Sequence, residues 1–581
     1  MKKAITLLFA LCLSGAVLAQ APADTFVEQT IGAPVSLDPA RAYDSASGRI
    51  LDNVYERLYT YDEPNIDEFV PALATDYSVS EDGLTYTFTL REGVQFHSGN
   101  TLSCKDVEWS WERNFVTASP EGAGNYLLGA QLIGTQITGA DPAAYQEEVS
   151  FADIDSAIEC PEGPDGMTVD INLLNPDPAL IAVQAYSAFS VVDSEWAIEN
   201  GAWDGTEATW TEWIGRDLTQ GFLHDNVSGT GAYQLVEWGG ETVVAEKYDG
   251  YWGEEASLEN VVIQVVPEQS TRILSVQQGD ADMILINERA ALVQLEGAPG
   301  VTIHEDPSWS PTSVTAAFYN FDIETSNNED VGSGQLDGNG IPSDFFADVN
   351  VRRAFSHLFD HQGFVEQVYD GAGQPLTMGL PPSFLGYNDD IAVRSLDLEA
   401  AEQYFREAFD GELWENGFEF TAIYNEGNTI RQTSLEIIAE NVEFINPNFR
   451  MNVRSLPWAD FLTRTAEQRA PMFVLGWGAD YADPRNFINT FYDNDGFYAA
   501  RTSIDSPEMQ PLIDEANAIV DPAERAFLYR QIGAIHFDEA PLIPIPMQSP
   551  FIVTSANLEG VYYNPMRAAG SVTLWKDLSK N

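Results

Sequence analysis

His357 and His361 have the spacing that comes closest to a metal-binding pair, and Asp360 lies between them. On a helix, residues four apart lie on the same face, where two imidazoles could hold a zinc ion. The acid that accompanies such a pair in zinc enzymes is usually a glutamate. We therefore interpret both histidines as structural and predict no metal site.

Catalytic patterns of other kinds are missing from the sequence. It contains no Gly-x-Ser-x-Gly nucleophile elbow, no Gly-x-x-x-x-Gly-Lys phosphate loop and no His-Glu-x-x-His zinc helix. Paired carboxylates could support glycoside hydrolysis in so acidic a chain, but nothing in the sequence positions such a pair. We predict no catalytic residues, no cofactor and no enzymatic activity, with an exported hydrolase as a remote alternative.

The first 19 residues predict export. Lys2 and Lys3 precede an apolar run over residues 4–18, and Ala19 ends a group of small residues suited to signal peptidase. The run is shorter than the roughly 20 residues that span a bilayer, and no later segment is longer. We expect residues 1–19 to be a signal peptide, and the mature chain to be periplasmic or otherwise extracytoplasmic without inserting into the membrane.

The composition limits both the class of protein and its partners. Hydrophobic residues make up 44% and aromatic residues 12%, which excludes a disordered chain, and 581 residues imply two or three domains. The 90 acidic and 28 basic residues give a net charge of −62. Such a surface repels nucleic acid and anionic lipid, so both are excluded as partners. The acidity is interpreted either as adaptation to salt or as attraction of cationic ligands.

Two cysteines, Cys104 and Cys160, remain after the predicted cleavage. An even number in an oxidising compartment predicts a disulfide, and no Cys-x-x-Cys motif or histidine cluster points to a metal instead.

Hydrophobic periodicity predicts an α/β protein with more than one lobe. Alternation with period two predicts strands, and apolar residues three and four apart predict amphipathic helices. The polar segment 322–339 is interpreted as a surface loop. Strands are predicted at 26–30, 85–90, 168–173, 261–266, 418–423 and 472–475, and helices at 47–59, 106–115, 351–369, 398–409 and 430–442.

Four sequence blocks follow one another along the chain. They are Ser36-Leu37-Asp38-Pro39 with 53–58; 71–74 with 80–99 and 105–107; 229–233 with Tyr251-Trp252-Gly253; and 351–355 with 476–484. In this order and spacing they resemble the extracytoplasmic solute-binding proteins of ABC importers, family 5, which contains dipeptide- and oligopeptide-binding proteins. The resemblance covers nearly the whole mature chain.

That resemblance implies a type II periplasmic-binding-protein fold of the large kind. Two α/β lobes would close over a buried ligand, and an additional third domain would be attached to one of the lobes. The implied boundaries are 20–70, 225–300 and 530–581 for lobe I, 71–224 for the additional domain, and 301–529 for lobe II.

The same resemblance suggests which residues bind the two ends of a peptide. Asp480 matches the carboxylate that pairs with the peptide α-ammonium, because a buried charge must be paired. Arg431, near the start of a predicted helix, is the candidate for the peptide carboxylate, which its planar guanidinium fits. Val474 stands where oligopeptide binders carry an arginine, three residues before Trp477. This departure favours a shorter ligand.

Further candidates would form the walls of the site. Trp458 and Trp477 are nineteen positions apart, as are the pocket tryptophans of oligopeptide binders, and Tyr126 is expected at the mouth. Extended segments would bind the peptide backbone like an added strand, near Ala33, Val35 and Gly476.

The function that this resemblance implies is capture of a short peptide for delivery to the transmembrane subunits of an ABC permease. We expect the protein to act as a monomer. Other members of the family bind oligosaccharides, nickel or haem, which are the alternatives within the binding class.

Overall fold

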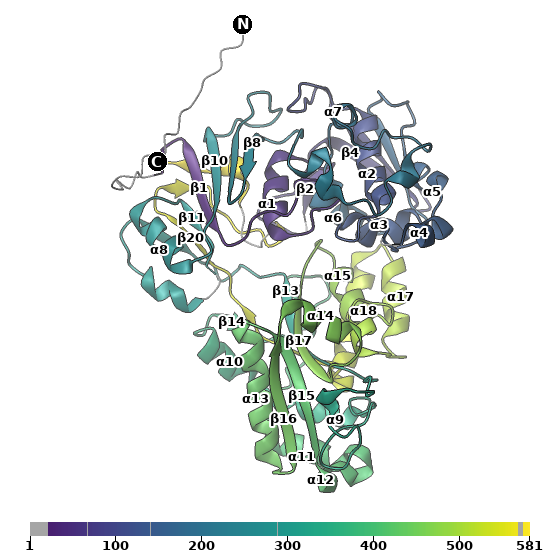
Figure 1. Ribbon diagram of the computed structural model, residues 1–581, viewed down its shortest axis with the longest axis vertical. Helices are drawn as coiled ribbons and strands as arrows, with labels where there is room; N and C mark the ends of the chain where they lie inside the picture. The colour runs from purple at the N-terminus through teal and green to yellow at the C-terminus, as the bar shows by residue number, and fades with distance from the viewer. Residues whose placement is uncertain (1–20, 67, 140, 287–288, 568–572) are drawn as a thin grey trace.

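The computed structural model describes residues 21–66, 68–139, 141–286, 289–567 and 573–581, and the predicted signal peptide lies outside them. The chain forms two bodies, one above the other in Figure 1, and each body is built on its own β-sheet. A third region with a separate sheet lies beside the upper sheet. This arrangement agrees with the predicted α/β fold of two lobes and an additional domain.

Lobe I is assembled from three separate stretches of chain around a seven-stranded sheet of order β12-β20-β11-β1-β10-β9-β8. The central strand β1 runs parallel to both β10 and β11. Successive side chains of a strand face opposite sides of a sheet, so Phe26 packs into the main core while Val27 packs against α8. The strands are β1 (Thr25–Thr30), β8 (Tyr233–Gly239), β9 (Thr242–Lys247), β10 (Asn260–Val265), β11 (Met283–Ile284), β12 (Val301–His304) and β20 (Ile552–Ser555), with helices α1 (Ser45–Val54) and α8 (Gln269–Gln278).

The additional domain is a four-stranded sheet of order β4-β5-β7-β6 covered by helices. Its hydrophobic residues join those of lobe I in one continuous core. The strands are β4 (Ala74–Val79), β5 (Thr85–Leu90), β6 (Ile158–Glu159) and β7 (Thr168–Asn172), and the helices are α2 (Cys104–Thr117), α3 (Gly124–Leu132), α4 (Pro142–Glu148), α5 (Phe151–Asp155), α6 (Leu180–Gln184) and α7 (Ser194–Glu199).

Lobe II surrounds a five-stranded sheet of order β16-β15-β17-β13-β18. Its strands are β13 (Ser313–Tyr319), β15 (Phe418–Asn425), β16 (Phe449–Leu456), β17 (Met472–Gly478) and β18 (Leu542–Pro544). Its helices are α9 (Val349–Ser356), α10 (His361–Val368), α11 (Leu398–Glu407), α12 (Glu412–Asn416), α13 (Thr429–Ile445), α14 (Trp458–Ala466), α15 (Arg485–Tyr492), α16 (Ala499–Thr502), α17 (Gln510–Ala518) and α18 (Pro522–Glu539). Three pairs of short strands lie outside these sheets: β2 (Tyr59–Tyr61) with β3 (Phe69–Pro71), β14 (Gly373–Gln374) with β19 (Met547–Gln548), and β21 (Leu558–Glu559) with β22 (Ser579–Lys580).

The structure moves the last predicted domain boundary. The division after residue 529 falls inside α18, whose Leu528 and Ile532 are buried in one hydrophobic cluster of lobe II. The next strand, β18, pairs with β13 of the same lobe. Because one helix cannot be divided between two cores, the chain returns to lobe I only after β19, and β20 is the first strand to rejoin its sheet.

Two predicted helices are shorter than their hydrophobic patterns suggest. The helix predicted over 47–59 ends at Val54, although Tyr55 and Leu58 are fully buried. These apolar residues reach the core from extended backbone, which periodicity alone does not distinguish from another helical turn. The helix predicted over 351–369 is divided into α9 and α10.

Glu56 connects two of the four sequence blocks in the folded protein. Its carboxylate, on a buried segment of lobe I, accepts hydrogen bonds from Thr230 Oγ1 (2.8 Å), the Tyr251 hydroxyl (3.0 Å) and Trp252 Nε1 (2.7 Å). Burial raises the pKa of this carboxyl, while the three donors oppose the rise. The blocks around residues 56, 230 and 252 are therefore linked through the interior of lobe I.

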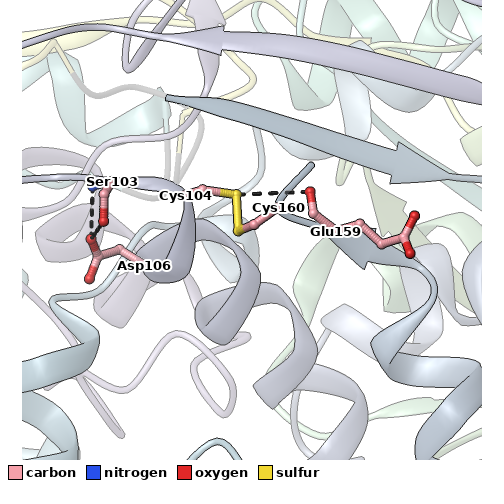
Figure 2. Close-up of a disulfide and its surroundings, with 5 residues drawn as sticks. All are labelled: Ser103, Cys104, Asp106, Glu159 and Cys160. Carbon is pink, nitrogen blue, oxygen red and sulfur yellow. Dashed lines mark hydrogen bonds between the residues drawn. A yellow bond between two sulfur atoms is a disulfide. The ribbon is translucent and has the colours of Figure 1, made fainter. Parts of the chain in front are cut away.

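Cys104 and Cys160 form the predicted disulfide, shown in Figure 2. It joins the first residue of α2 to the residue after β6, and the two cysteines are 56 positions apart. Beside it, Asp106 accepts a hydrogen bond from the Ser103 backbone N–H (2.9 Å) and completes the cap of α2. The disulfide therefore fixes the start of this helix to the small sheet.

Replacing both cysteines by alanine is expected to lower the free energy of unfolding of the additional domain by about 2–4 kcal/mol, because the disulfide restricts the unfolded chain. Thermal unfolding with and without a reducing agent would measure this effect. The wild type should lose stability on reduction, whereas the double variant should not respond. An unchanged wild-type melting temperature after complete reduction would contradict the prediction.

Candidate ligand-binding site

A cavity of about 590 Å³ lies between the two lobes. Lobe II contributes the end of β17 and the segment that leads into β13, while lobe I and the additional domain contribute the start of α1 and two loops. Its lining residues are Tyr43, Asp44, Ser45, Gly48, Asp52, 185–187, 311–313, 476–480, Tyr563, Pro565, Met566 and Arg567. Five segments distant in sequence therefore meet around one cavity.

Asp480 is the most buried carboxylate on the wall of this cavity, with 8% of its surface exposed. It follows β17, and its orientation is set from both lobes. The Tyr43 hydroxyl of lobe I donates a hydrogen bond to Oδ1 (2.9 Å), and Asn486 Nδ2 of lobe II donates one to Oδ2 (3.2 Å). Both partners are neutral. In the described part of the chain, no cationic side chain forms an ion pair with Asp480.

Burial controls the protonation of this group. Loss of water raises the pKa of Asp480 from 3.8 to about 6, and the hydrogen bonds from Asn486 and Tyr43 oppose the rise. Burial, and then the nearby negative charge of Asp480, raise the pKa of Tyr43 far above its usual range, so its hydroxyl remains a donor. At neutral pH the cavity thus presents a carboxylate that lacks a positive counter-charge.

Trp477 and Gly476 lie in the same strand and line the same cavity. Trp477 Nε1 donates to Asn486 Oδ1 (3.1 Å), the same oxygen that accepts from the Asp480 backbone N–H. Asn486 therefore holds the indole ring and the carboxylate in one fixed arrangement. The carbonyl oxygen of Gly476 accepts a hydrogen bond from the Tyr498 hydroxyl (3.0 Å).

Two of the predicted residues lie next to this arrangement without lining the cavity. The Tyr126 ring packs against Trp477 with centroids 6.3 Å apart, and Tyr126 lines a neighbouring cavity of about 280 Å³. Arg431, in the first turn of α13, donates through Nη1 to Asn425 Oδ1 (2.6 Å). Its Nη2 lies 3.7 Å from the point that a Cβ atom on Gly476 would occupy. Burial lowers the pKa of Arg431.

Neither Ala33 nor Val35 lines the cavity. Ala33 and Val35 lie in an exposed stretch, and the Val35 backbone N–H donates to Ser47 Oγ (2.9 Å) rather than facing the site. Trp458 begins α14, and its side chain lies outside the described part of the structure. Contact of these three residues with a ligand stays a prediction.

The structure adds lining residues that the sequence did not indicate, among them Tyr43, Asp44, Tyr186, Tyr563 and Arg567. Only Asp44 carried a local signal, because an aspartate before an apolar helical pattern is a typical N-cap, and here it caps α1. The others come from loops whose partners are hundreds of residues away. No local pattern could have indicated their role.

The histidine pair is separated by the fold. Asp360 caps α10 by accepting from the Gly363 N–H, so His357 ends one helix region while His361 begins the next. His361 Nε2 lies 3.1 Å from the Pro544 carbonyl oxygen, and burial lowers the pKa of His361 to about 4. Across the described residues, no group of three or more His, Cys, Asp or Glu side chains could hold a metal ion, and no described helix could span a membrane.

The geometry defines a class of protein. A cavity between two lobes, with fixed polar groups and aromatic walls, is typical of a binding protein that closes around its ligand. The chain belongs to the bacterial extracellular solute-binding proteins, family 5, whose middle region matches residues 68–499. This match confirms the resemblance seen in the four sequence blocks.

Known relatives agree with this assignment. The heme-binding protein A of Haemophilus influenzae is 26% identical over 551 residues, which cover 93% of this chain and 90% of that relative. The dipeptide-binding protein of Escherichia coli is 23% identical, and the matched region covers 95% of this chain and 94% of that relative. Among solved structures, the periplasmic binding protein DppA from Helicobacter pylori, in complex with the peptide STSA, has a TM-score of 0.70. That structure is 23% identical and covers 97% of this chain and 99% of the other. It shows the same fold.

Proposed function

We propose that this protein is the exported substrate-binding component of an ABC importer and that its ligand is a short peptide. The observation that carries the proposal is Asp480, a buried carboxylate on the cavity wall whose hydrogen-bond donors are both neutral. A buried charge without a counter-charge is costly, and the α-ammonium of a peptide would supply that counter-charge on binding.

The rest of the peptide would be recognised by the groups around Asp480. Trp477 and the cavity tyrosines offer apolar area that tolerates varied side chains. Arg431, beside Gly476 and close to the cavity, is the candidate for the carboxylate end, since guanidinium and carboxylate groups fit one another through two parallel hydrogen bonds. A volume of about 590 Å³ falls within the range of small-molecule sites and suits a short ligand.

Mechanistically, ligand binding would favour the closed arrangement of the lobes. Tyr43 of lobe I and Asp480 of lobe II already touch across the cavity, so a ligand that contacts both would stabilise this closure. The protein would act as a monomer that retains its ligand without turnover, and a permease would recognise the liganded form. Export through residues 1–19 would place it outside the cytoplasmic membrane.

Haem is the alternative that the relatives raise, because one of them is named for haem and another for dipeptides. The propionate groups of haem are negatively charged, and in this cavity they would approach Asp480 and Asp44. Charge therefore favours a ligand that carries an ammonium group.

A thermal-shift and calorimetric series on ligand-stripped protein tests the proposal. Free dipeptides and tripeptides are expected to raise the melting temperature, since ligand at 100 times Kd adds about 2.7 kcal/mol to the folded state. The same peptides with an acetylated N-terminus should lose most of this effect, because their amide is uncharged. Equal stabilisation by acetylated peptides, or stabilisation only by haem, an oligosaccharide or Ni²⁺, would overturn the peptide assignment.

The affinity for peptides is expected to fall in mild acid. An ammonium ion pairs with the ionised carboxylate, and Asp480 becomes protonated as the pH falls through its pKa of about 6. Below that pH, the dissociation constant should rise by up to about tenfold per pH unit as long as the complex keeps the carboxylate ionised. Calorimetric titrations between pH 5 and pH 8 would measure this. A constant affinity over that range would contradict the role of Asp480.

A further inference from the structure

The charged groups around the cavity are not balanced. Asp52 and Glu63 are paired with two arginines, because Arg57 contacts Asp52, and Arg567 contacts Glu63 through Nε (2.7 Å) and lies 3.9 Å from Asp52. Arg567 is the only cationic side chain among the described residues that line the cavity, and its side chain is 2% exposed. These two acids and two arginines cancel one another.

Asp44 has no such compensation. Its Oδ1 accepts a hydrogen bond from the Ser47 backbone N–H (2.9 Å) as the N-cap of α1. Its Oδ2 is buried and has no hydrogen-bond partner among the described residues. The backbone N–H at the start of α1 satisfies Oδ1 but leaves Oδ2 without a donor. Asp44 and Asp480 thus leave two negative charges on the wall of one cavity.

Aromatic rings line the same cavity as these two carboxylates. Tyr43 and Tyr186 line the cavity with ring centroids 6.0 Å apart, and Tyr563 lines it as well. Burial, followed by the negative charges of Asp480, Asp52 and Asp44, raises the pKa of Tyr186. Tyrosine faces attract ammonium and guanidinium groups. A cation entering this region would meet both charge and aromatic surface.

We propose that the protein selects peptides that carry a lysine or arginine side chain, with the α-ammonium on Asp480 and the basic side chain directed to Asp44. This inference rests on the proposed function and specifies its substrate class. A peptide with a neutral side chain would neutralise Asp480 but leave the negative charge of Asp44 without a counter-charge. The net charge of −62 acts in the same direction, since it concentrates cations near the surface.

The test compares peptides in which lysine is replaced by norleucine, which keeps the aliphatic chain and removes the ammonium group. Calorimetry on stripped wild-type protein would use Lys-Ala with Nle-Ala, Ala-Lys with Ala-Nle, and the corresponding tripeptides. At least one lysine peptide is expected to bind about tenfold to a hundredfold more tightly than its norleucine partner, the range for a charge-assisted hydrogen bond.

The Asp44→Asn variant tests whether Asp44 causes the preference for lysine peptides. Asparagine is also a good N-cap, so α1 should be retained, and the melting temperature of the unliganded variant verifies this. The lysine preference should fall to about threefold or less. Asp141→Asn is the matched control, because Asp141 is an exposed N-cap of α4 and its loss changes the net charge equally.

The outcomes separate this inference from the proposed function. If lysine and norleucine peptides bind the wild type equally, basic selectivity is wrong and the peptide assignment stands. If the lysine preference persists in Asp44→Asn, Asp44 is not its cause and the inference fails. If no peptide binds while another solute does, the proposed function itself is overturned.

Discussion

Replacement of Asp480 by asparagine is expected to remove most of the affinity for peptides while making the unliganded protein more stable. Truncating one partner of a buried charge pair typically costs about 2–5 kcal/mol, which corresponds to at least a roughly 30-fold rise in the dissociation constant. The variant keeps the shape of the side chain. Its carbonyl oxygen can accept from Asn486, and its amide can donate to the Tyr43 hydroxyl.

The expected gain in stability follows from the pKa of the same group. Folded Asp480 holds its proton more tightly than an unfolded aspartate, because its pKa is about 6 rather than 3.8. Protonation therefore favours the folded state, and the contribution of Asp480 becomes less favourable as the pH rises from about 3.8 to about 6. Above that window the cost reaches about 3 kcal/mol, which asparagine would remove.

Two measurements on the stripped protein check this prediction. Calorimetry with a free dipeptide should show the loss of affinity, and thermal unfolding at pH 7.5 should show a higher melting temperature for Asp480→Asn. Near pH 4 the difference in stability between variant and wild type should shrink. Asp141→Asn serves again as the control for a changed net charge. An affinity within threefold of the wild type would refute the ammonium-binding role.

Asp38→Ala is expected to be among the most destabilising single substitutions in this chain and to leave ligand affinity unchanged. Arg113 of α2 donates from Nη1 and Nη2 to the two carboxylate oxygens of Asp38, at 2.6 Å each. The residues are 3% and 0% exposed, so this pair joins lobe I to the additional domain without contact with solvent. Removing one partner of such a pair typically costs about 3–5 kcal/mol, because the other charge stays buried.

A double-mutant cycle measures this pair. Asp38→Ala and Arg113→Leu should each lower the unfolding midpoint in urea strongly, and the double variant should lose much less than both losses added together. Midpoints are compared because a chain of several domains need not unfold in two states. Strictly additive losses would show that the ion pair is not the cause. Peptide affinity should be unchanged in the folded Asp38→Ala variant. That result would show that Asp38 has a structural role in its sequence block, in contrast to the ligand-binding role proposed for Asp480.

Local sequence patterns accounted for much of the secondary structure. Alternation of apolar residues predicted β5, β7 and β10, and helical spacing predicted α11 and α13 to within a few residues. The cysteine count predicted the disulfide, and the block around 476–484 drew attention to Asp480 and Trp477, which the fold places together on one cavity wall. These features depend on neighbours in sequence or on a short motif, so they could be recognised without a structure.

Tertiary structure alone decided what faces Asp480. Tyr43, Tyr186 and Tyr563 reach the cavity from three segments that are separated by more than a hundred residues, and nothing local to each tyrosine distinguishes it from a core aromatic. Tertiary structure also decided the balance of charge in the cavity. Arg567 pairs with Glu63, whereas Asp44 has no counter-charge among the described residues. Pairing of buried charges depends on contacts that form only when distant segments close on one another. The sequence by itself determined the family and predicted Asp480 as the principal carboxylate, and the folded arrangement decided which groups surround that carboxylate.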